Sequence, residues 1–348
     1  MAADERPAGQ LSPHDALRRG HWVKLICGAS NQDIPAITDL CAVYGAVGID
    51  CIDVSADPAV VRAARQGLRW LEQHGMARPW LMVSVSDGSD AHFRKAWFDP
   101  ARCPVDCPRP CQRVCPAEAI AAQGAVDERR CYGCGRCLPS CPLGLIEERD
   151  HRLGSDAIAE LMAAMRPDAV EVHTAPGRGE AFDAVLAQLA LSGVPLQRLA
   201  VSCGLEGYAL TPSALGQELW QRHSSLRRWG FSPLWQLDGR PMSGDVGAGT
   251  ARVAVQLWRW MQPLAPPGPL QLAGGTNAST VQLLLPEERP AGVAFGGMAR
   301  RLLMPLIQEA QAQGTSLRHW PEGWRAGLEL ARSLVEPWRR RPGMERPC

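Results

Sequence analysis

The strongest constraint on the fold of this chain is a cluster of cysteines. Eight of its 13 cysteines lie between Cys103 and Cys141, in two quartets that each end in Cys-Pro. The chain starts without an apolar run that could act as a secretory signal, and its longer apolar stretches are interrupted by Gly, Pro or Arg. We therefore expect a cytoplasmic protein without a transmembrane segment, in which the clustered thiols bind metal rather than form disulfides.

The spacing within the quartets indicates iron–sulfur clusters. The second quartet follows the run C-x2-C-x2-C-x3-C-P of bacterial two-cluster ferredoxins at every defined position, and Gly133 and Gly135 let the backbone wrap closely around a cluster. In the first quartet the two earlier intervals are each one residue longer. The first quartet is Cys103, Cys107, Cys111 and Cys115, and the second is Cys131, Cys134, Cys137 and Cys141.

The resemblance to these ferredoxins implies two [4Fe–4S] clusters with crossed ligands, because the fourth cysteine of each run binds the other cluster. One ligand set would be Cys103, Cys107, Cys111 and Cys141, and the other Cys115, Cys131, Cys134 and Cys137. The alternative is a pair of zinc sites, which also use closely spaced cysteines.

The rest of the chain alternates short apolar runs with helical patterns. The strand candidates are 22–27, 51–55, 80–84, 169–174, 198–203, 233–238, 270–273 and 292–295. The helical stretches are 34–47, 59–74, 156–165, 181–191, 213–226, 251–261 and 303–313, and only 279–285 is available after the seventh strand. Eight strand–helix units predict an α/β fold of the TIM-like (β/α)8 type, with an open doubly wound α/β sheet as the alternative.

The cysteine segment interrupts this alternation after the third strand. We expect residues 97–149 to form a ferredoxin-like insert at the C-terminal face of the barrel, where barrel active sites lie. Residues 21–96 and 150–335 would form the barrel, between a flexible N-terminal tail, 1–20, and a C-terminal tail, 336–348. A redox module in this place could exchange electrons with a molecule bound in the barrel mouth.

Strand alternation directs several polar side chains toward the barrel axis. The residues that face the outer helices should be apolar, so Lys24 in the first strand should point inward. The same rule turns inward Asp53, Glu171, His173, Arg198, Gln236, Asp238 and Gln271. Charges inside a barrel are costly unless paired, so they predict either a buried ion-pair network or a ligand site. The candidate catalytic residues of such a site are Lys24, Asp53, Glu171 and His173.

Two glycine pairs follow the last two predicted strands. They lie where barrels of this type bind phosphate with backbone amides and a helix N-terminus. Such glycines are also ordinary turn formers, so a flavin or another phosphate ligand is one of two interpretations. The four candidate residues are Gly274, Gly275, Gly296 and Gly297.

Three segments together resemble the cyanobacterial light-dependent period protein family: residues 22–33, residues 48–54 and the cysteine insert. The resemblance implies iron–sulfur centres that report the cellular redox state to a complex containing Kai clock proteins and a clock input kinase. The 37 basic and 36 acidic side chains leave a net charge of +1, so we expect protein partners and no nucleic acid.

Two functions remain open on these grounds. A redox-sensing regulatory protein needs only a surface that changes with the charge or occupancy of its clusters. An iron–sulfur oxidoreductase needs a substrate or flavin near the inward side chains. A simple electron carrier is disfavoured, because most of the chain lies outside the cysteine segment. We favour the non-enzymatic sensor.

Overall fold

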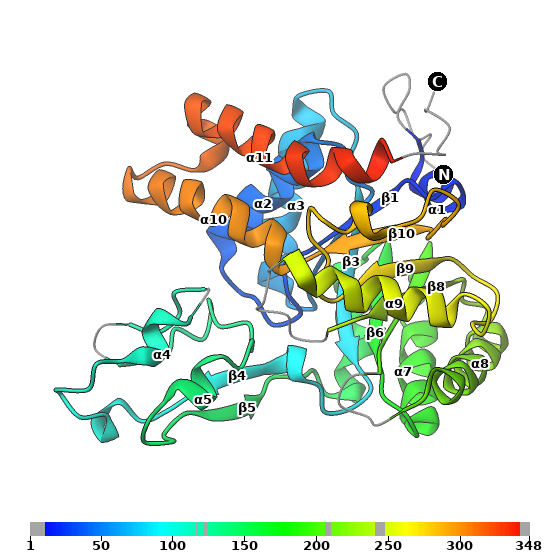
Figure 1. Ribbon diagram of the computed structural model, residues 1–348, viewed down its shortest axis with the longest axis horizontal. Coiled ribbons are helices and arrows are strands. Elements are labelled where there is room, and N and C mark those ends of the chain that lie inside the picture. The colour runs from blue at the N-terminus through cyan, green and yellow to red at the C-terminus, as the bar shows by residue number, and fades with distance from the viewer. Residues whose placement is uncertain (1–10, 116, 122–123, 206–209, 241–247, 342–348) are drawn as a thin grey trace.

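The computed structural model describes residues 11–341, except 116, 122–123, 206–209 and 241–247. Eight parallel strands form a closed barrel in the order β1-β10-β9-β8-β7-β6-β3-β2 (Figure 1). The (β/α)8 prediction is confirmed, and the open sheet is wrong because β1 pairs with both β2 and β10. The strands are β1 (Trp22–Ile26), β2 (Cys51–Ser55), β3 (Trp80–Ser86), β6 (Ala169–His173), β7 (Arg198–Cys203), β8 (Pro233–Asp238), β9 (Leu270–Ala273) and β10 (Gly292–Phe295).

Helices cover the outside of the barrel. The outward side chains of the strands, such as Val23 and Leu25 of β1, are buried in one core with the helices. The helices are α2 (Ile34–Ala46), α3 (Pro58–Gln73), α6 (Ile158–Met165), α7 (Gly179–Leu191), α8 (Pro212–Trp229), α9 (Ala251–Met261), α10 (Gly297–Ala312) and α11 (Pro321–Arg339). After β9 stands only a 3-10 turn, η5 (Val281–Leu283); the other short turns of the barrel are η3 (Ser155–Ala157), η4 (Ala248–Thr250) and η6 (Leu317–His319).

The two segments predicted as tails contain helical structure. Helix α1 (Pro13–Arg19) starts at the cap residue Ser12. It buries Leu17 against the apolar side chains that fill the barrel interior at the N-terminal ends of the strands. Helix α11 extends to Arg339, and Trp338 is fully buried. The prediction of tails at 1–20 and 336–348 is therefore wrong for these parts, because their burial depends on surfaces that only the closed barrel creates. Residues 1–10 and 342–348 of the predicted tails lie outside the described residues.

The cysteine segment stands beside the barrel, between β3 and α6 (Figure 1). Its base is an antiparallel pair, β4 (Arg94–Trp97) and β5 (Glu147–Asp150), so the base is slightly wider than the predicted 97–149. The guanidinium of Arg149 lies over the Trp97 ring, 3.4 Å from its centre. Its short helical turns are η1 (Ala91–Phe93), η2 (Pro100–Arg102), α4 (Pro110–Arg113) and α5 (Cys137–Ser140). Within the part of the chain that the structure describes, none of the helices combines the length and hydropathy of a membrane span.

Candidate functional site

The eight cysteines of the insert fall into two spatial groups, each drawn from both quartets. Burial raises the pKa of Cys111, and the neighbouring thiols of Cys141, Cys103 and Cys107 raise it further. Burial likewise raises the pKa of Cys137 to about 12, with contributions from Cys134, Cys131 and Cys115. We call the first group the outer cysteine site (Cys103, Cys107, Cys111 and Cys141) and the second the inner cysteine site (Cys115, Cys131, Cys134 and Cys137).

The inner cysteine site surrounds a hollow of about 460 Å³, measured with its opening to solvent. All four of its cysteines line this hollow, together with apolar side chains that include Ile120 and Leu138. The backbone amide of Ala96 donates to Cys131 Sγ at 3.3 Å, and that of Ala119 donates to Cys115 Sγ at 3.2 Å. Four thiols, amide donors to sulfur and a largely apolar wall are the groups that hold a [4Fe–4S] cluster, so the residues fit this cofactor.

The outer cysteine site is more open but has the same kind of backbone support. Burial would raise the pKa of the Cys141 thiol, but backbone amides led by that of Leu145 outweigh it and lower the pKa. The Leu145 amide lies 3.4 Å from Cys141 Sγ. This arrangement favours the thiolate, which is the form that binds metal.

Inside the barrel, Lys24 forms a buried ion pair with Glu171 and lies 3.5 Å from a carboxylate oxygen of Asp53. Gln236 Nε2 donates to the other oxygen of Glu171 at 2.8 Å, and Gln271 Nε2 donates to Gln236 Oε1 at 2.7 Å. Five of the predicted inward side chains are thus joined in one network, namely Lys24, Asp53, Glu171, Gln236 and Gln271. Lys24 is a structural cation rather than a free amine, because its neighbouring carboxylates hold it in the ammonium form.

The carboxyl groups of this network differ in their pKa values. Burial raises the pKa of Asp53 to about 6, although Lys24 opposes the shift. Burial also raises the pKa of Asp238 to about 6, and the charge of Glu171 adds to it. Burial would raise the pKa of Glu171 too, but Lys24 and His173 outweigh burial and lower it to about 2. Glu171 is therefore the carboxylate of the network that stays ionised to the lowest pH.

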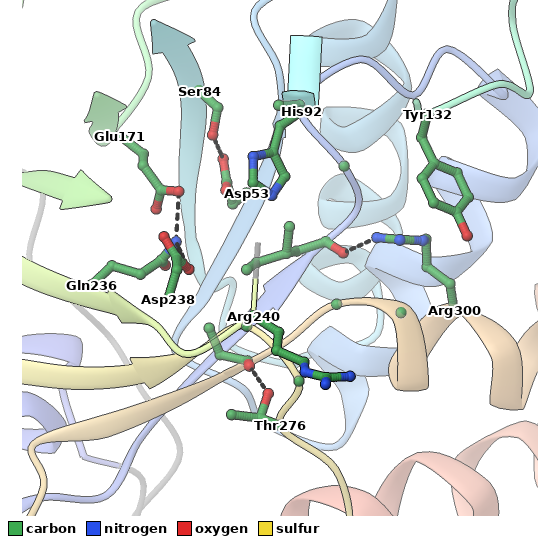
Figure 2. Close-up of a pocket in the computed structure, with 18 of the residues that line it drawn as sticks. Asp53, Ser84, His92, Tyr132, Glu171, Gln236, Asp238, Arg240, Thr276 and Arg300 are labelled. Carbon is green, nitrogen blue, oxygen red and sulfur yellow. Dashed lines mark hydrogen bonds between the residues drawn. The ribbon is translucent and has the colours of Figure 1, made fainter. Parts of the chain in front are cut away.

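Above the network a cavity opens at the C-terminal ends of the strands (Figure 2). It measures about 770 Å³ with its opening to solvent. Asp53, Glu171 and His173 reach it, whereas Lys24 does not line it. The glycines predicted as a phosphate site also line it, namely Gly274, Gly275, Gly296 and Gly297. Arg198 lies elsewhere, at the N-terminal end of β7 and 3.4 Å from His14 of α1.

The insert contributes part of the wall of this barrel-mouth cavity. Tyr132 and Cys134 both line it, and Cys134 lines the hollow of the inner cysteine site as well. Arg300 of α10 connects the two parts, since its guanidinium lies 4.3 Å from the Tyr132 ring centre and donates to the carbonyl of Ile26 at 2.8 Å. A ligand in the mouth would thus adjoin Cys134, a predicted cluster ligand.

Several residues of this cavity were not among those predicted from the sequence. Ser84 donates to Asp53 Oδ1 at 2.8 Å, and Arg240 and Arg300 add positive charge to the wall. His92 lies in the loop after β3, at the face of the barrel where active sites occur. Its position in this loop is the sequence feature from which it could have been predicted as a site residue. Tyr132 stands directly beside a predicted cluster ligand.

Comparisons with known proteins agree with these features. A family model described as "Light dependent period A C-terminal domain" matches residues 161–337, and one described as "LdpA Fe-S cluster-binding domain" matches residues 103–152. The protein "Light dependent period A" of Synechococcus elongatus is 46% identical over 340 aligned positions, and the match covers 95% of this chain and 95% of that protein. The chain therefore carries an iron–sulfur cluster-binding domain.

Solved structures with a similar arrangement are more distant. A deoxyribose phosphate aldolase from Aeropyrum pernix is 12% identical, with a TM-score of 0.42 over 83% of this chain and 90% of that chain. A putative fructose-1,6-biphosphate aldolase from Coccidioides immitis is 11% identical, with a TM-score of 0.43 over 94% and 91%. The barrel assignment rests on the closed strand order, and the family on the sequence matches. This chain belongs to the Light dependent period A family.

Proposed function

We propose that this protein is a cytoplasmic redox sensor that carries two [4Fe–4S] clusters and reports their state to protein partners. The observation that carries the proposal is the division of the eight thiols into two sets of four, with Cys134 in a wall shared by the inner site and the barrel. When bound, the clusters supply one-electron redox chemistry. The relative's name, Light dependent period A, supports a role in setting a light-dependent period.

The two sites would have different tasks. Three of the four outer thiols are partly exposed, and the apolar side chains Val105 and Leu143 beside them are 98% and 53% exposed. This surface is suited to contact with a redox protein. The inner site faces the barrel through Tyr132 and Cys134, so a change of its charge acts on the Arg300 contact that joins insert and barrel.

Metal analysis and two cysteine variants test the cofactor part. Anaerobic reconstitution should yield about eight irons and eight labile sulfides per chain, following from two cubane clusters. Cys115→Ser should perturb the inner cluster and Cys141→Ser the outer one, each while sparing the other cluster in paired electron paramagnetic resonance spectra. Four irons per chain, zinc without sulfide, or loss confined to each residue's own sequence quartet would contradict the assignment.

Partner binding tests the sensor part. The family resemblance points to Kai clock proteins and a clock input kinase as the partners to use. Their affinity for the anaerobic protein should differ between the dithionite-reduced and the oxidised state. The control is the Cys115→Ser/Cys141→Ser variant, which lacks one thiol ligand of each proposed cluster. Equal affinity in both states for all of these partners would contradict redox sensing.

A second candidate function is an iron–sulfur oxidoreductase whose substrate or flavin binds in the barrel mouth. It is supported by the position of Cys134 beside the cavity, and by Arg240 and Arg300 near the glycine loops, which suit a phosphate group. Of the candidate catalytic residues, Asp53 and His173 would face the ligand, while Lys24 and Glu171 hold them in place. Release of a stoichiometric flavin or phosphorylated compound from the anaerobically purified protein would favour this function, and its absence would favour the sensor.

A further inference from the structure

A cluster of metal-binding side chains, separate from the cysteines, lies at the barrel mouth. It consists of Asp90 and His92 from the loop after β3 and His173 from the end of β6. One ligand atom from each lies within 4.8 Å of the other two. His92 and His173 both line the barrel-mouth cavity, and Figure 2 shows His92 among the other lining side chains.

The spacing of the three side chains suits a metal ion. His92 Nδ1 lies 2.8 Å from Asp90 Oδ1, and His173 Nδ1 lies 3.7 Å from Asp90 Oδ2. Metal bonds of about 2.0 to 2.1 Å would place neighbouring ligand atoms of a tetrahedral site about 3.3 Å apart. The two separations, to different oxygens of Asp90, lie on either side of this value. The shorter one is a hydrogen bond between His92 and Asp90, which a metal ion would replace.

His173 is oriented by a second carboxylate in the way that metal-bound histidines usually are. Its Nε2 lies 3.0 Å from Glu171 Oε1, so an Nε2–H group donates to Glu171 while Nδ1 faces Asp90, where a metal ion would take the place of a proton. Glu171 is held in turn by Lys24 and Gln236. This buried chain fixes the ring orientation of His173.

The charge at the floor of the cavity also favours a cation, while Arg240 and Arg300 bring positive charge to its wall. Asp53, Glu171 and Asp238 are all at least 92% buried at its floor, and Asp90 Oδ2 lies 3.7 Å from His173 Nδ1. Burial raises the pKa values of Asp53 and Asp238 to about 6, and Glu171 adds to both shifts. These carboxylates crowd negative charge around one buried lysine, Lys24, so a divalent ion would reduce the cost of burying them.

We propose that Asp90, His92 and His173 bind one divalent transition-metal ion, with zinc as the test ion, at the mouth of the barrel. Two histidines and one carboxylate are a donor set of mononuclear zinc and iron(II) sites that keep a coordination position open. Here the open position faces the cavity, where it would take an oxygen atom of a small anionic ligand. The site would act independently of the two iron–sulfur clusters.

Zinc binding to the full chain with its clusters assembled tests the proposal. After dialysis against EDTA and addition of Zn²⁺, mass spectrometry should find one zinc per chain in addition to the cluster iron. X-ray absorption at the zinc edge should show nitrogen and oxygen ligands and no sulfur. His92→Gln and His173→Gln should each lower the zinc affinity about 100-fold or more. Loss of a residue that only hydrogen-bonds to a metal ligand already lowers metal affinity about 10- to 100-fold.

Two controls keep the result specific. His74→Gln changes an exposed histidine of the barrel exterior and should leave zinc binding unchanged. Asp90→Asn can still accept the cap hydrogen bond of η1 from the His92 amide, so a folded protein with normal cluster iron but weakened zinc binding is expected. The proposal would be overturned by sulfur ligation of the zinc, by unchanged zinc affinity in both histidine variants, or by no zinc beyond trace level. The iron and sulfide content of the same samples tests the proposed function separately.

Discussion

Replacement of Lys24 by methionine tests whether the charged barrel interior is held together by one buried cation. Lys24 is fully buried, forms an ion pair with Glu171 and lies 3.5 Å from Asp53. Methionine fills a similar volume without charge, so the variant removes the cation and leaves two buried carboxylates without it. Removal of one partner of a buried ion pair costs about 3 to 5 kcal/mol.

The pKa of Glu171 gives an independent magnitude. Burial alone would raise this pKa, but Lys24 and then His173 lower it from 4.5 to about 2. A depression of this size is worth about 3 kcal/mol of folding free energy, at about 1.4 kcal/mol per pKa unit. Because the folded-state pKa is depressed, this contribution is fully present above pH 4.5 and is lost as the pH falls toward 2. Both arguments therefore predict a loss of about 3 kcal/mol at pH 7.

Urea unfolding at pH 7, followed by tryptophan fluorescence on protein with full cluster iron, measures this loss. The double variant Lys24→Met/Glu171→Gln should recover part of it, since only Asp53 then remains unpaired. The control Arg18→Met removes an exposed ion pair with Asp15 and should cost less than about 1 kcal/mol. A folded Lys24→Met protein that loses no more stability than Arg18→Met, or a double variant without recovery, would refute the account of the interior.

Three further changes have expected outcomes. Gly133→Ala should cut the iron content of the reconstituted protein by about half, because Gly133 has φ +70° and a Cβ would strike the β4 backbone. Gly144→Ala is the control; Gly144 has φ +61° but lies in open space, so this variant should lose little iron in the same iron assay. Wild-type stability should rise as the pH falls from 7 to 5.5 in urea titrations, because the raised folded-state pKa of Asp53 favours proton uptake by the folded protein, and Asp53→Asn should reduce this rise. Arg300→Met removes a positive charge beside Tyr132 and should make the inner cluster's reduction potential more negative in a redox titration.

The strands and the outer helices were predictable because they depend on local periodicity. Inward and outward residues alternate along a strand, and this alternation alone predicts that Lys24 and Glu171 point into the barrel, where they form an ion pair. Prolines and aspartates at helix starts act over one turn; Asp57, for example, caps α3 through the amides of Ala59 and Val60. The spacing of the cysteines and their Cys-Pro endings likewise carried the iron–sulfur prediction within one short segment.

Only the tertiary structure decided which distant residues meet. Asp90 and His92 are far from His173 in sequence, and they come together because β3 pairs with β6 across the insert. The shared wall at Cys134 depends on how the insert rests against α10, and α1 was recognisable as a helix only once there was a barrel end for Leu17 to cover. Periodicity reports the face on which a residue lies, whereas its partner across the fold depends on chain closure and on packing between segments that no local pattern encodes.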